Sequence, residues 1–253
     1  MLKDLVTLNI FGFLLIFARI GTTFAMMPGV SASYVPTRVR LGLALAVSFV
    51  IAPVLAVGLP TLPPTVPGLA LLVAGEILVG AFFGTIARIM FASLQTAGTV
   101  IAYSSSMANA LIQDPIAEQQ SATISGFLLA AGLVAVFVTD MHHLMIRAVI
   151  DSYDLFQPGH ALPFSDLAHM MGRYVADSFR LGLQMAAPFV VAGLTYYIGL
   201  GLLGRLMPQL QVFFFGLPFQ ITAQIWVMTV AFSGILLAFM NHFAEGYAPF
   251  LAP

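Results

Sequence analysis

Six long hydrophobic stretches alternate along the chain with short segments that contain proline, glycine and polar residues. A helix that crosses a bilayer needs about 20 mostly apolar residues, and each stretch approaches that length. Proline and glycine mark the joins at PGVSASYVP, LPTLPPTVPG, QPGHALPFSD and MPQLQVFFFGLP. The pattern predicts apolar helices over residues 5–27, 41–59, 69–91, 124–139, 181–203 and 219–240.

One polar run, SSSMANALIQDPIAEQQ, interrupts the pattern between the third and fourth stretches. It retains apolar residues such as Met107, Leu111 and Ile112, which suit a cavity lined by protein, where non-helical backbone is tolerated at membrane depth. The run therefore indicates a re-entrant or pore-lining loop, with an ordinary surface loop as the alternative. A serine nucleophile is disfavoured because no histidine lies nearby in the sequence and no Gly-x-Ser-x-Gly motif is present.

Charged residues stand inside the apolar stretches at Arg19, Glu76 and Arg88. A charge at the centre of a bilayer costs about 2.5 to 3.5 kcal/mol, so these side chains are expected to face protein or water. Glu76, Gly80, Gly84 and Arg88 are spaced four residues apart along one helical face, and Gly80 with Gly84 forms a GxxxG pair that lets another helix approach closely. Glu76 and Arg88 are separated by roughly 18 Å of helix, so each needs a partner elsewhere, on this chain or another.

The composition assigns the protein to the membrane class. Of the 253 residues, 60% are hydrophobic and 8% are charged, whereas about a quarter of the residues in soluble domains are charged. No polar linker separates the stretches, so we expect residues 1–253 to form a single membrane-associated domain. The net charge of -1 provides no basic patch for nucleic acid, and the absence of cysteine excludes disulfides and thiolate metal sites. The first stretch lacks a cleavage site and is expected to be a retained helix.

The densest group of ionisable residues is TDMHHLMIRAVIDSYD. Helical spacing would place Asp140 beside His143, His143 beside Arg147, and Arg147 beside Asp151. A metal site would need imidazoles and carboxylates without a competing cation, and Arg147 argues against one. We therefore interpret the group as charges near a helix end that satisfy one another, and we expect no metal ion and no cofactor. A membrane hydrolase that uses His142 and His143 is kept as an alternative.

Three aromatic residues, Phe213, Phe214 and Phe215, lie in a short segment between Pro208 and Pro218. The segment is too short to span a bilayer, and proline is expected to interrupt the helix at both of its ends. One interpretation is a belt of aromatic rings at the membrane interface. The other is the tip of a helical hairpin whose rings seal against neighbouring subunits, and the sequence leaves both open.

Several segments, in the same order along the chain, carry a resemblance to known proteins. The most specific are VPTRVRLGLAL, the segment from Gly98 to Pro115 with its closing Asp-Pro, and GLGLLGRLMPQLQVFFFGLP. GEILVGAFFGTIARIMFASLQTAG and DMHHLMIRAVIDSYDLFQPG extend the similarity over nearly the whole chain. Together these segments resemble the FliR family, whose members are core subunits of the flagellar type III protein export gate, with relatives in virulence injectisomes.

The resemblance implies an all-α integral membrane subunit, built as helical hairpins within a multi-subunit helical assembly, and without enzymatic activity. Such a subunit joins FliP and FliQ and recruits FlhB. It is located in the bacterial inner membrane, within the flagellar basal body, with the assembly largely at the periplasmic face. Unfolded flagellar proteins would pass through its centre, membrane lipid would surround it, and nucleic acid would play no part.

In the FliR family, the central loop projects into the pore and plugs it while the gate is closed. The resemblance places this plug at Tyr103, Ser104, Ser105, Ser106, Met107, Asn109, Ile112, Asp114, Pro115 and Gln119. Relatives often carry Gln-Met-Gly where this chain has the three serines, and aromatic residues at Asn109 and Ile112. We therefore hypothesise that this smaller and more polar plug seals by hydrogen bonds instead of aromatic packing.

Besides the membrane hydrolase, two other functions are compatible with the sequence. An injectisome export subunit fits the same resemblance. A small-molecule secondary transporter would share the apolar helices, broken segments and intramembrane charges, but it would predict inverted internal repeats, and the six stretches show none.

Overall fold

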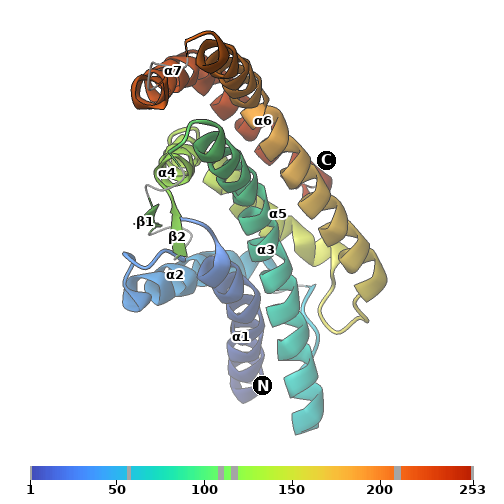
Figure 1. Cartoon of the computed structure of the whole chain (residues 1–253). Coiled ribbons are helices and arrows are strands. Elements are labelled where there is room, and N and C mark those ends of the chain that lie inside the picture. Colours follow the sequence, from blue (N-terminus) through green and yellow to red (C-terminus); the bar gives the residue numbers. More distant parts are fainter. Residues whose placement is uncertain (1, 56–57, 108–110, 115–118, 208–211, 252–253) are drawn as a thin grey trace. The chain divides into compact units, whose positions relative to one another are not determined.

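The computed structural model describes residues 2–55, 58–107, 111–114, 119–207 and 212–251, and it describes side chains at 10–55, 58–107, 123–207 and 216–251 (Figure 1). The helices are α1 (Leu2–Met26), α2 (Thr37–Leu55), α3 (Val66–Ser104), α4 (Thr123–Val138), α5 (Met141–Leu155), α6 (Phe164–Leu206) and α7 (Val212–Tyr247), followed by a 3-10 turn (Ala248–Phe250). The predicted helical membrane class is confirmed, because each of the six hydrophobic stretches lies largely within a separate helix.

Two helices extend well beyond the stretches that predicted them. α3 continues past residue 91 to Ser104, and α6 begins at Phe164 instead of residue 181. Hydropathy detects the part of a helix that fits a bilayer, whereas the helix itself continues through serine, glutamine and charged residues when one of its sides is packed. The same reasoning explains why α5, which is rich in polar residues, was not among the six stretches.

The segment between α3 and α4, where a re-entrant central loop was predicted, contains a pair of short β-strands within the otherwise helical chain. Strand β1 (Leu111–Asp114) pairs antiparallel with β2 (Gln119–Ala122), with Leu111 opposite Ala122 and Asp114 opposite Gln119 (Figure 1). Backbone N–H and C=O groups removed from water need hydrogen-bond partners, and strand pairing provides partners for the groups that face each other across the two strands.

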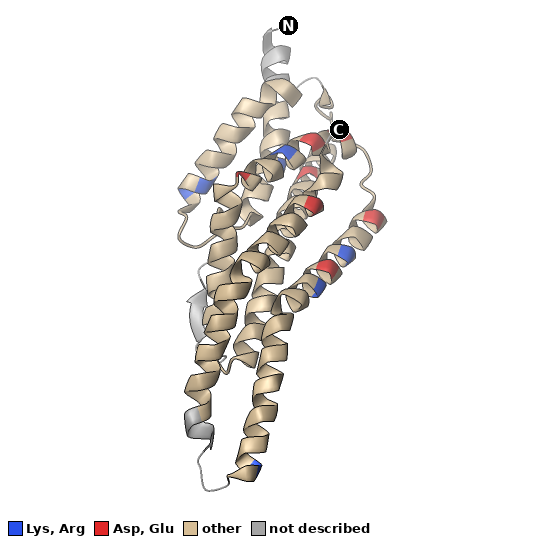
Figure 2. Ribbon diagram, turned by 90° about the horizontal axis from the view of Figure 1, so that it is seen from above, with Lys and Arg blue, Asp and Glu red and all other residues tan. Residues whose placement is uncertain are grey.

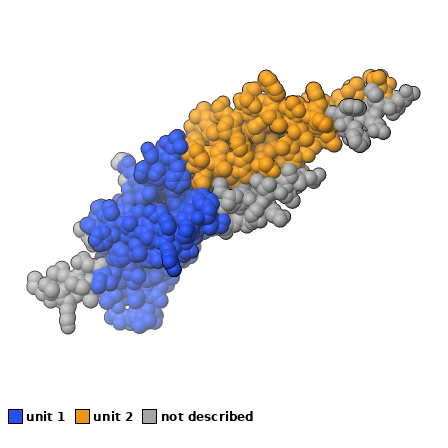
Figure 3. Space-filling view, turned by 90° about the vertical axis from the view of Figure 1, so that its left-hand side faces the viewer, with its two compact units in different colours: residues 1–89, 137–174, 244–253 blue, residues 90–136, 175–243 orange. Residues whose placement is uncertain are grey.

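The chain divides into two compact units, coloured blue and orange in Figure 3. Unit 1 contains residues 1–89, 137–174 and 244–253, and unit 2 contains residues 90–136 and 175–243. Helices α3, α4, α6 and α7 each contribute residues to both units. The expectation of a single domain therefore stays a prediction.

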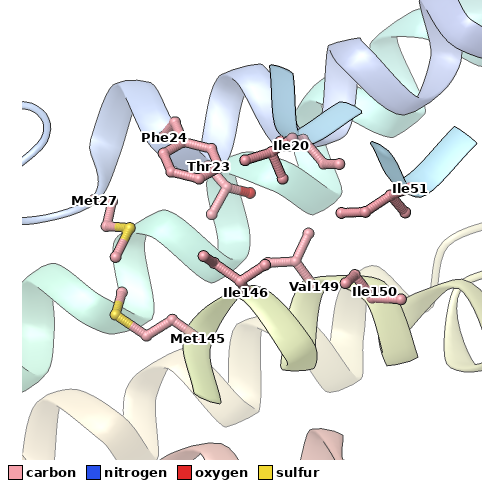
Figure 4. A pocket seen from close by; sticks show the side chains of 10 residues that line it. Ile20, Thr23, Phe24, Met27, Ile51, Met145, Ile146, Val149 and Ile150 are labelled. Carbon is pink, nitrogen blue, oxygen red and sulfur yellow. The ribbon is translucent and has the colours of Figure 1, made fainter. Parts of the chain in front are cut away.

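The core of unit 1 is built on aromatic side chains and on the contact between α1 and α2. Phe82 and Phe83 of α3 pack edge-to-face against Phe250, with ring centroids 5.9 and 4.9 Å apart. Around a small apolar cavity, Ile20 of α1 and Ile51 of α2 face Val149 of α5 (Figure 4). These contacts hold α1, α2 and α5 together through apolar burial.

The core of unit 2 depends on close approach between helices. A Cβ atom at Gly98 of α3 would lie 2.3 Å from the Cα atom of Ser125 in α4, so only glycine allows these backbones to come so near. Phe91 of α3 packs against Phe239 of α7, with ring centroids 5.1 Å apart. Both rings are buried.

Within the described residues, four helices are long and apolar enough to cross a membrane, or up to five if α4 and α5 form one broken span. Figure 2 shows long ribbon stretches without a charged residue. In α6, for example, no charge occurs between Arg180 and Arg205.

The expected helix break at Pro218 is wrong. α7 begins at Val212 and continues through Pro218 as one helix of 36 residues. The missing N–H of proline removes one hydrogen bond near the start of the helix, and a long apolar helix tolerates this loss.

Candidate functional site

The polar run predicted to carry the function leaves α3 at its last turn. Tyr103 and Ser104 are still helical, and the Tyr103 side chain is exposed. Ser105 is buried, and its hydroxyl donates to the carbonyl oxygen of Ala102 at 3.2 Å. Ser106 adopts the left-handed region with φ 60°, which is uncommon for a residue other than glycine and indicates that its surroundings hold it there.

Those surroundings are a group of hydrogen-bonded polar residues in unit 2, which we call the polar anchor: Ser104, Ser106, Tyr197 of α6 and Gln220 of α7. The Ser106 hydroxyl donates to Oε1 of Gln220 at 3.2 Å and lies 3.0 Å from the Tyr197 hydroxyl. Nε2 of Gln220 donates to the Ser104 carbonyl oxygen at 2.9 Å and to the Tyr197 hydroxyl at 3.1 Å. Gln220 is only 1% exposed.

The donors in the polar anchor have one consistent assignment. Each hydroxyl has a single hydrogen, and Ser106 gives its hydrogen to Gln220. Tyr197 therefore donates to Ser106 while accepting from Gln220, which closes a ring of three hydrogen bonds. The ring ties the end of α3 to α6 and α7, so it fixes the point from which the hairpin leaves the helix.

The second end of the hairpin is also fixed to α3. β2 leads directly into α4 at Thr123. The Ser125 hydroxyl donates to the Gln95 carbonyl oxygen at 3.2 Å, one turn from the close approach at Gly98. Both ends of residues 105–122, which we call the hairpin segment, are therefore attached within unit 2.

The structure describes only some of the other predicted plug residues. Ile112 and Asp114 lie in β1 and Gln119 lies in β2. Asn109 and Pro115 lie outside the described residues, and the side chains of the strands lie outside them too. The backbone therefore supports a hairpin at this position, while its sealing chemistry stays a hypothesis.

The three phenylalanines at 213–215 belong to the first turn of α7, and their side chains lie outside the described residues. Gly216, the next residue, is buried. Its carbonyl oxygen accepts a hydrogen bond from the Tyr196 hydroxyl of α6. The start of α7 is thus attached to α6, and both proposed roles of the aromatic rings stay predictions.

The charge of Glu76 is paired inside the chain. Nε and Nη2 of Arg19 donate to the two carboxylate oxygens of Glu76 at 2.7 and 3.0 Å. Arg19 also donates to Oγ of Ser152 at 3.0 Å and to the carbonyl oxygen of Phe156 at 2.7 Å, and its guanidinium carbon lies 3.7 Å from the ring centroid of Tyr153. With both charged side chains buried, this network joins α1, α3 and α5 by strong, charge-assisted bonds.

The two glycines beside Glu76 allow α1 to approach α3. A Cβ atom at Gly80 would lie 2.3 Å from the carbonyl oxygen of Arg19, and one at Gly84 would lie 2.5 Å from Cβ of Met26. The Thr23 hydroxyl donates to the Gly80 carbonyl oxygen at 3.1 Å. The predicted face of α3 therefore has two parts. Glu76, Gly80 and Gly84 are packed against α1, whereas the Arg88 side chain is exposed.

Large apolar faces remain uncovered on the described helices. In their most apolar windows, only 17% of the residues of α2 and of α6 are buried, against 39% of those of α3. Trp226 of α7 and Ile198 of α6 are among the exposed side chains. Exposed apolar area on this scale is typical of contact with lipid or with other subunits.

The sequence is similar to known proteins over most of its length. The sequence profile of the family described as "Bacterial export proteins, family 1" matches residues 10–246. The chain is 35% identical to "Flagellar biosynthetic protein FliR" of Caulobacter vibrioides, covering 91% of this chain and 92% of that one. It is 31% identical to the protein of the same name in Bacillus subtilis, covering 92% and 90%. "Yop proteins translocation protein T" of Yersinia pestis is 24% identical, covering 87% and 85%.

Proposed function

We propose, from the premise that the chain belongs to the bacterial export proteins of family 1, that it is a membrane subunit of the flagellar type III protein export gate. The predicted resemblance to the FliR family is confirmed, since relatives named FliR match over most of both chains. Their name supports a role in building the flagellum, and the family description supports protein export. The subunit contributes structure and a passage for the exported protein, and it carries out no catalysis.

Two observations on the same chain carry the proposal together: the uncovered apolar helix faces and a hairpin segment held at both ends. The faces fit lipid and neighbouring subunits, which we infer to be of the FliP, FliQ and FlhB types. Because such an assembly would cover its helices with protein, the subunit need not lie wholly in lipid, and we place the assembly at the periplasmic face of the inner membrane. Unfolded flagellar proteins pass through its centre.

In this proposal, the hairpin segment closes the pore and is displaced when substrate passes. Its ends stay attached within unit 2, to α6 and α7 through the polar anchor on one side and to α3 through the Ser125 contacts on the other. Strand pairing between residues 111–114 and 119–122 satisfies the backbone groups that face each other across the two strands. The hairpin segment can therefore move as a unit while the surrounding helices keep their packing.

The test replaces residues 108–122 by eight Gly and Ser residues, which reach up to about 26 Å when extended. The variant is expressed in a flagellated bacterium whose own FliR is deleted. We expect it to co-purify with FliP and FliQ and to make the membrane leaky to small solutes. The control inserts the same linker after Ala161, in the exposed connection between α5 and α6, and should leave the membrane tight.

Two outcomes would contradict different parts of the proposal. If the hairpin variant assembles and the membrane stays tight, the hairpin segment does not close a pore. If the unaltered chain neither restores swimming nor co-purifies with FliP and FliQ, the role in flagellar export is wrong.

An injectisome is the second candidate, supported by the similarity to the Yop translocation protein. The greater similarity to the flagellar relatives supports the flagellar system first. Expression in an injectisome strain that lacks its own subunit distinguishes the two, since we expect no restored secretion there.

A further inference from the structure

A cluster of three potential metal ligands lies at the start of α5. These residues have no part in the function proposed above. Asp140, His142 and His143 each offer a ligand atom, and these atoms all lie within 4.8 Å of one another. Nδ1 of His143 is 3.7 Å from Oδ1 of Asp140, and the two imidazole rings have centroids 4.1 Å apart. All three residues belong to unit 1.

Asp140 occupies the N-cap position of α5, where an aspartate side chain normally caps the helix. Such a side chain usually accepts a hydrogen bond from a backbone N–H of the first turn. The Asp140 side chain makes no such bond. Its backbone has φ 57°, an uncommon conformation that aspartate tolerates better than most residues. The carboxylate is directed toward His143 instead, which leaves it available as a ligand.

His142 is oriented by packing and retains an unused polar atom. Its ring stacks on that of Phe137, with centroids 5.0 Å apart and planes 24° apart. Its Nδ1 atom is buried and has no hydrogen-bond partner among the described residues. Buried polar atoms normally have a partner, and an imidazole held in one orientation is the usual form of a metal ligand.

The cation closest along the helix does not compete for the cluster. Arg147 would repel a metal ion if its guanidinium lay among the ligands. Its Nε atom lies 3.5 Å from Oδ2 of Asp151, one turn further along α5. The positive charge is therefore compensated by a different carboxylate, which removes the objection that the sequence raised.

We propose that Asp140, His142 and His143 bind a divalent transition-metal ion of the Zn²⁺ type. Two imidazoles and one carboxylate match the nitrogen and oxygen ligands that Zn²⁺, Ni²⁺ and Cu²⁺ accept, whereas Ca²⁺ and Mg²⁺ prefer oxygen alone. Ligand atoms around tetrahedral zinc are about 3.4 Å apart at bond lengths near 2.1 Å. The exposed side chains of Asp140 and His143 swing inward to reach this geometry.

The ion would connect the residue before α5 to the first turn of that helix. Three protein ligands leave a coordination position for water or for a group from another subunit. The site adds a binding activity that does not depend on the proposed role in export. Its failure would leave that role intact.

The test uses the full chain, purified in detergent with an affinity tag that contains no histidine. Zn²⁺ is titrated against a coloured chelator, and Co²⁺ binding is followed by the visible absorption that imidazole coordination produces. We expect one ion per chain. His143→Ala and Asp140→Asn should each weaken binding at least about tenfold, the lower end of the loss found even for residues that only orient a ligand. Asparagine also tolerates positive φ, so Asp140→Asn removes the charge without straining the backbone.

The control is His169→Ala, since His169 is an exposed histidine of α6 that lies outside the cluster. It should bind Zn²⁺ as the unaltered chain does. As a second readout, Zn²⁺ should slow hydrogen exchange at backbone amides 141–146 in the unaltered chain but not in His143→Ala. The proposal is overturned if binding is absent, if His143→Ala binds as tightly as the unaltered chain, or if His169→Ala loses as much affinity.

Discussion

Breaking the Arg19–Glu76 pair should destabilise the chain far more than breaking an exposed pair of the same chemistry. Two hydrogen bonds join the guanidinium to the carboxylate, and the side chains are 0% and 3% exposed. Removal of one partner leaves the other charge buried without compensation, which costs about 3 to 5 kcal/mol. Glu76→Gln keeps the shape of the side chain and removes its charge, so we expect the free energy of unfolding to fall by that amount.

A double-mutant cycle separates the pair from its surroundings. Arg19→Met also removes the hydrogen bonds to Ser152 and to the Phe156 carbonyl oxygen, so it should cost more than Glu76→Leu. The double variant Arg19→Met with Glu76→Leu leaves no buried charge. It should be more stable than the sum of the single losses predicts, by about 2 kcal/mol or more.

Arg147→Ala is the control, because Arg147 also pairs with a carboxylate, that of Asp151 at 3.5 Å, but its side chain is 66% exposed. Exposed pairs contribute at most about 1 kcal/mol. Unfolding is followed in mixed detergent micelles by denaturant titration, with hydrogen exchange in α1 and α3 as a second probe, since one transition cannot be assumed. A loss for Glu76→Gln no larger than that for Arg147→Ala, or an additive cycle, would refute the reasoning.

Three further predictions concern other parts of the chain. Gly80→Ala should lower the free energy of unfolding by about 1 to 3 kcal/mol, since its Cβ atom would overlap the backbone of α1; in Gly75→Ala, where no atom lies within 4 Å, thermal unfolding should shift little or upward. Tyr197→Phe removes two hydrogen bonds from the polar anchor and should cost about 1 to 3 kcal/mol, seen as faster hydrogen exchange at amides 104–107, and unchanged exchange there would contradict it. Trp226 is the single tryptophan and is 71% exposed, so brominated lipid should quench its fluorescence in the chain alone, and the lack of quenching would show that its face does not meet lipid.

The positions of the helices follow from the local hydrophobic pattern, but their lengths do not. Residues 92–104 include Ser93, Gln95 and Thr99, which lower the hydropathy of the third stretch without ending α3. Helix ends depend on caps and packing that a hydropathy average does not contain. The β-hairpin could not be predicted from the sequence for a related reason. Its strands have four residues each, too few for a clear alternation of apolar and polar positions.

The contacts that define the candidate site join residues remote in the sequence. Glu76 and Arg19 are separated by 57 positions, and Ser106 and Gln220 by 114. The sequence indicates that an intramembrane charge needs an opposite charge, and the opposite signs of Arg19 and Glu76 were the available signal for their pairing. Nothing comparable marks Tyr197 and Gln220, because neutral polar residues are common in membrane helices and hydrogen-bond one another without a fixed spacing.

Glycines inside the apolar helices fall into two groups that the sequence does not distinguish. Gly80 and Gly84 of α3 are closely approached by α1 of the same chain, whereas Gly199, Gly201 and Gly204 of α6 have no such neighbour within 4 Å. Each glycine costs a helix about 1 kcal/mol relative to alanine, and the second group gains no packing within the described residues to offset that cost. Close approach favours glycine whichever chain the second helix belongs to. Gly201 and Gly204 are three residues apart and lie on one face of α6. In the proposed assembly, a helix of a neighbouring subunit that comes close to this face would give these two glycines the role that α1 gives Gly80.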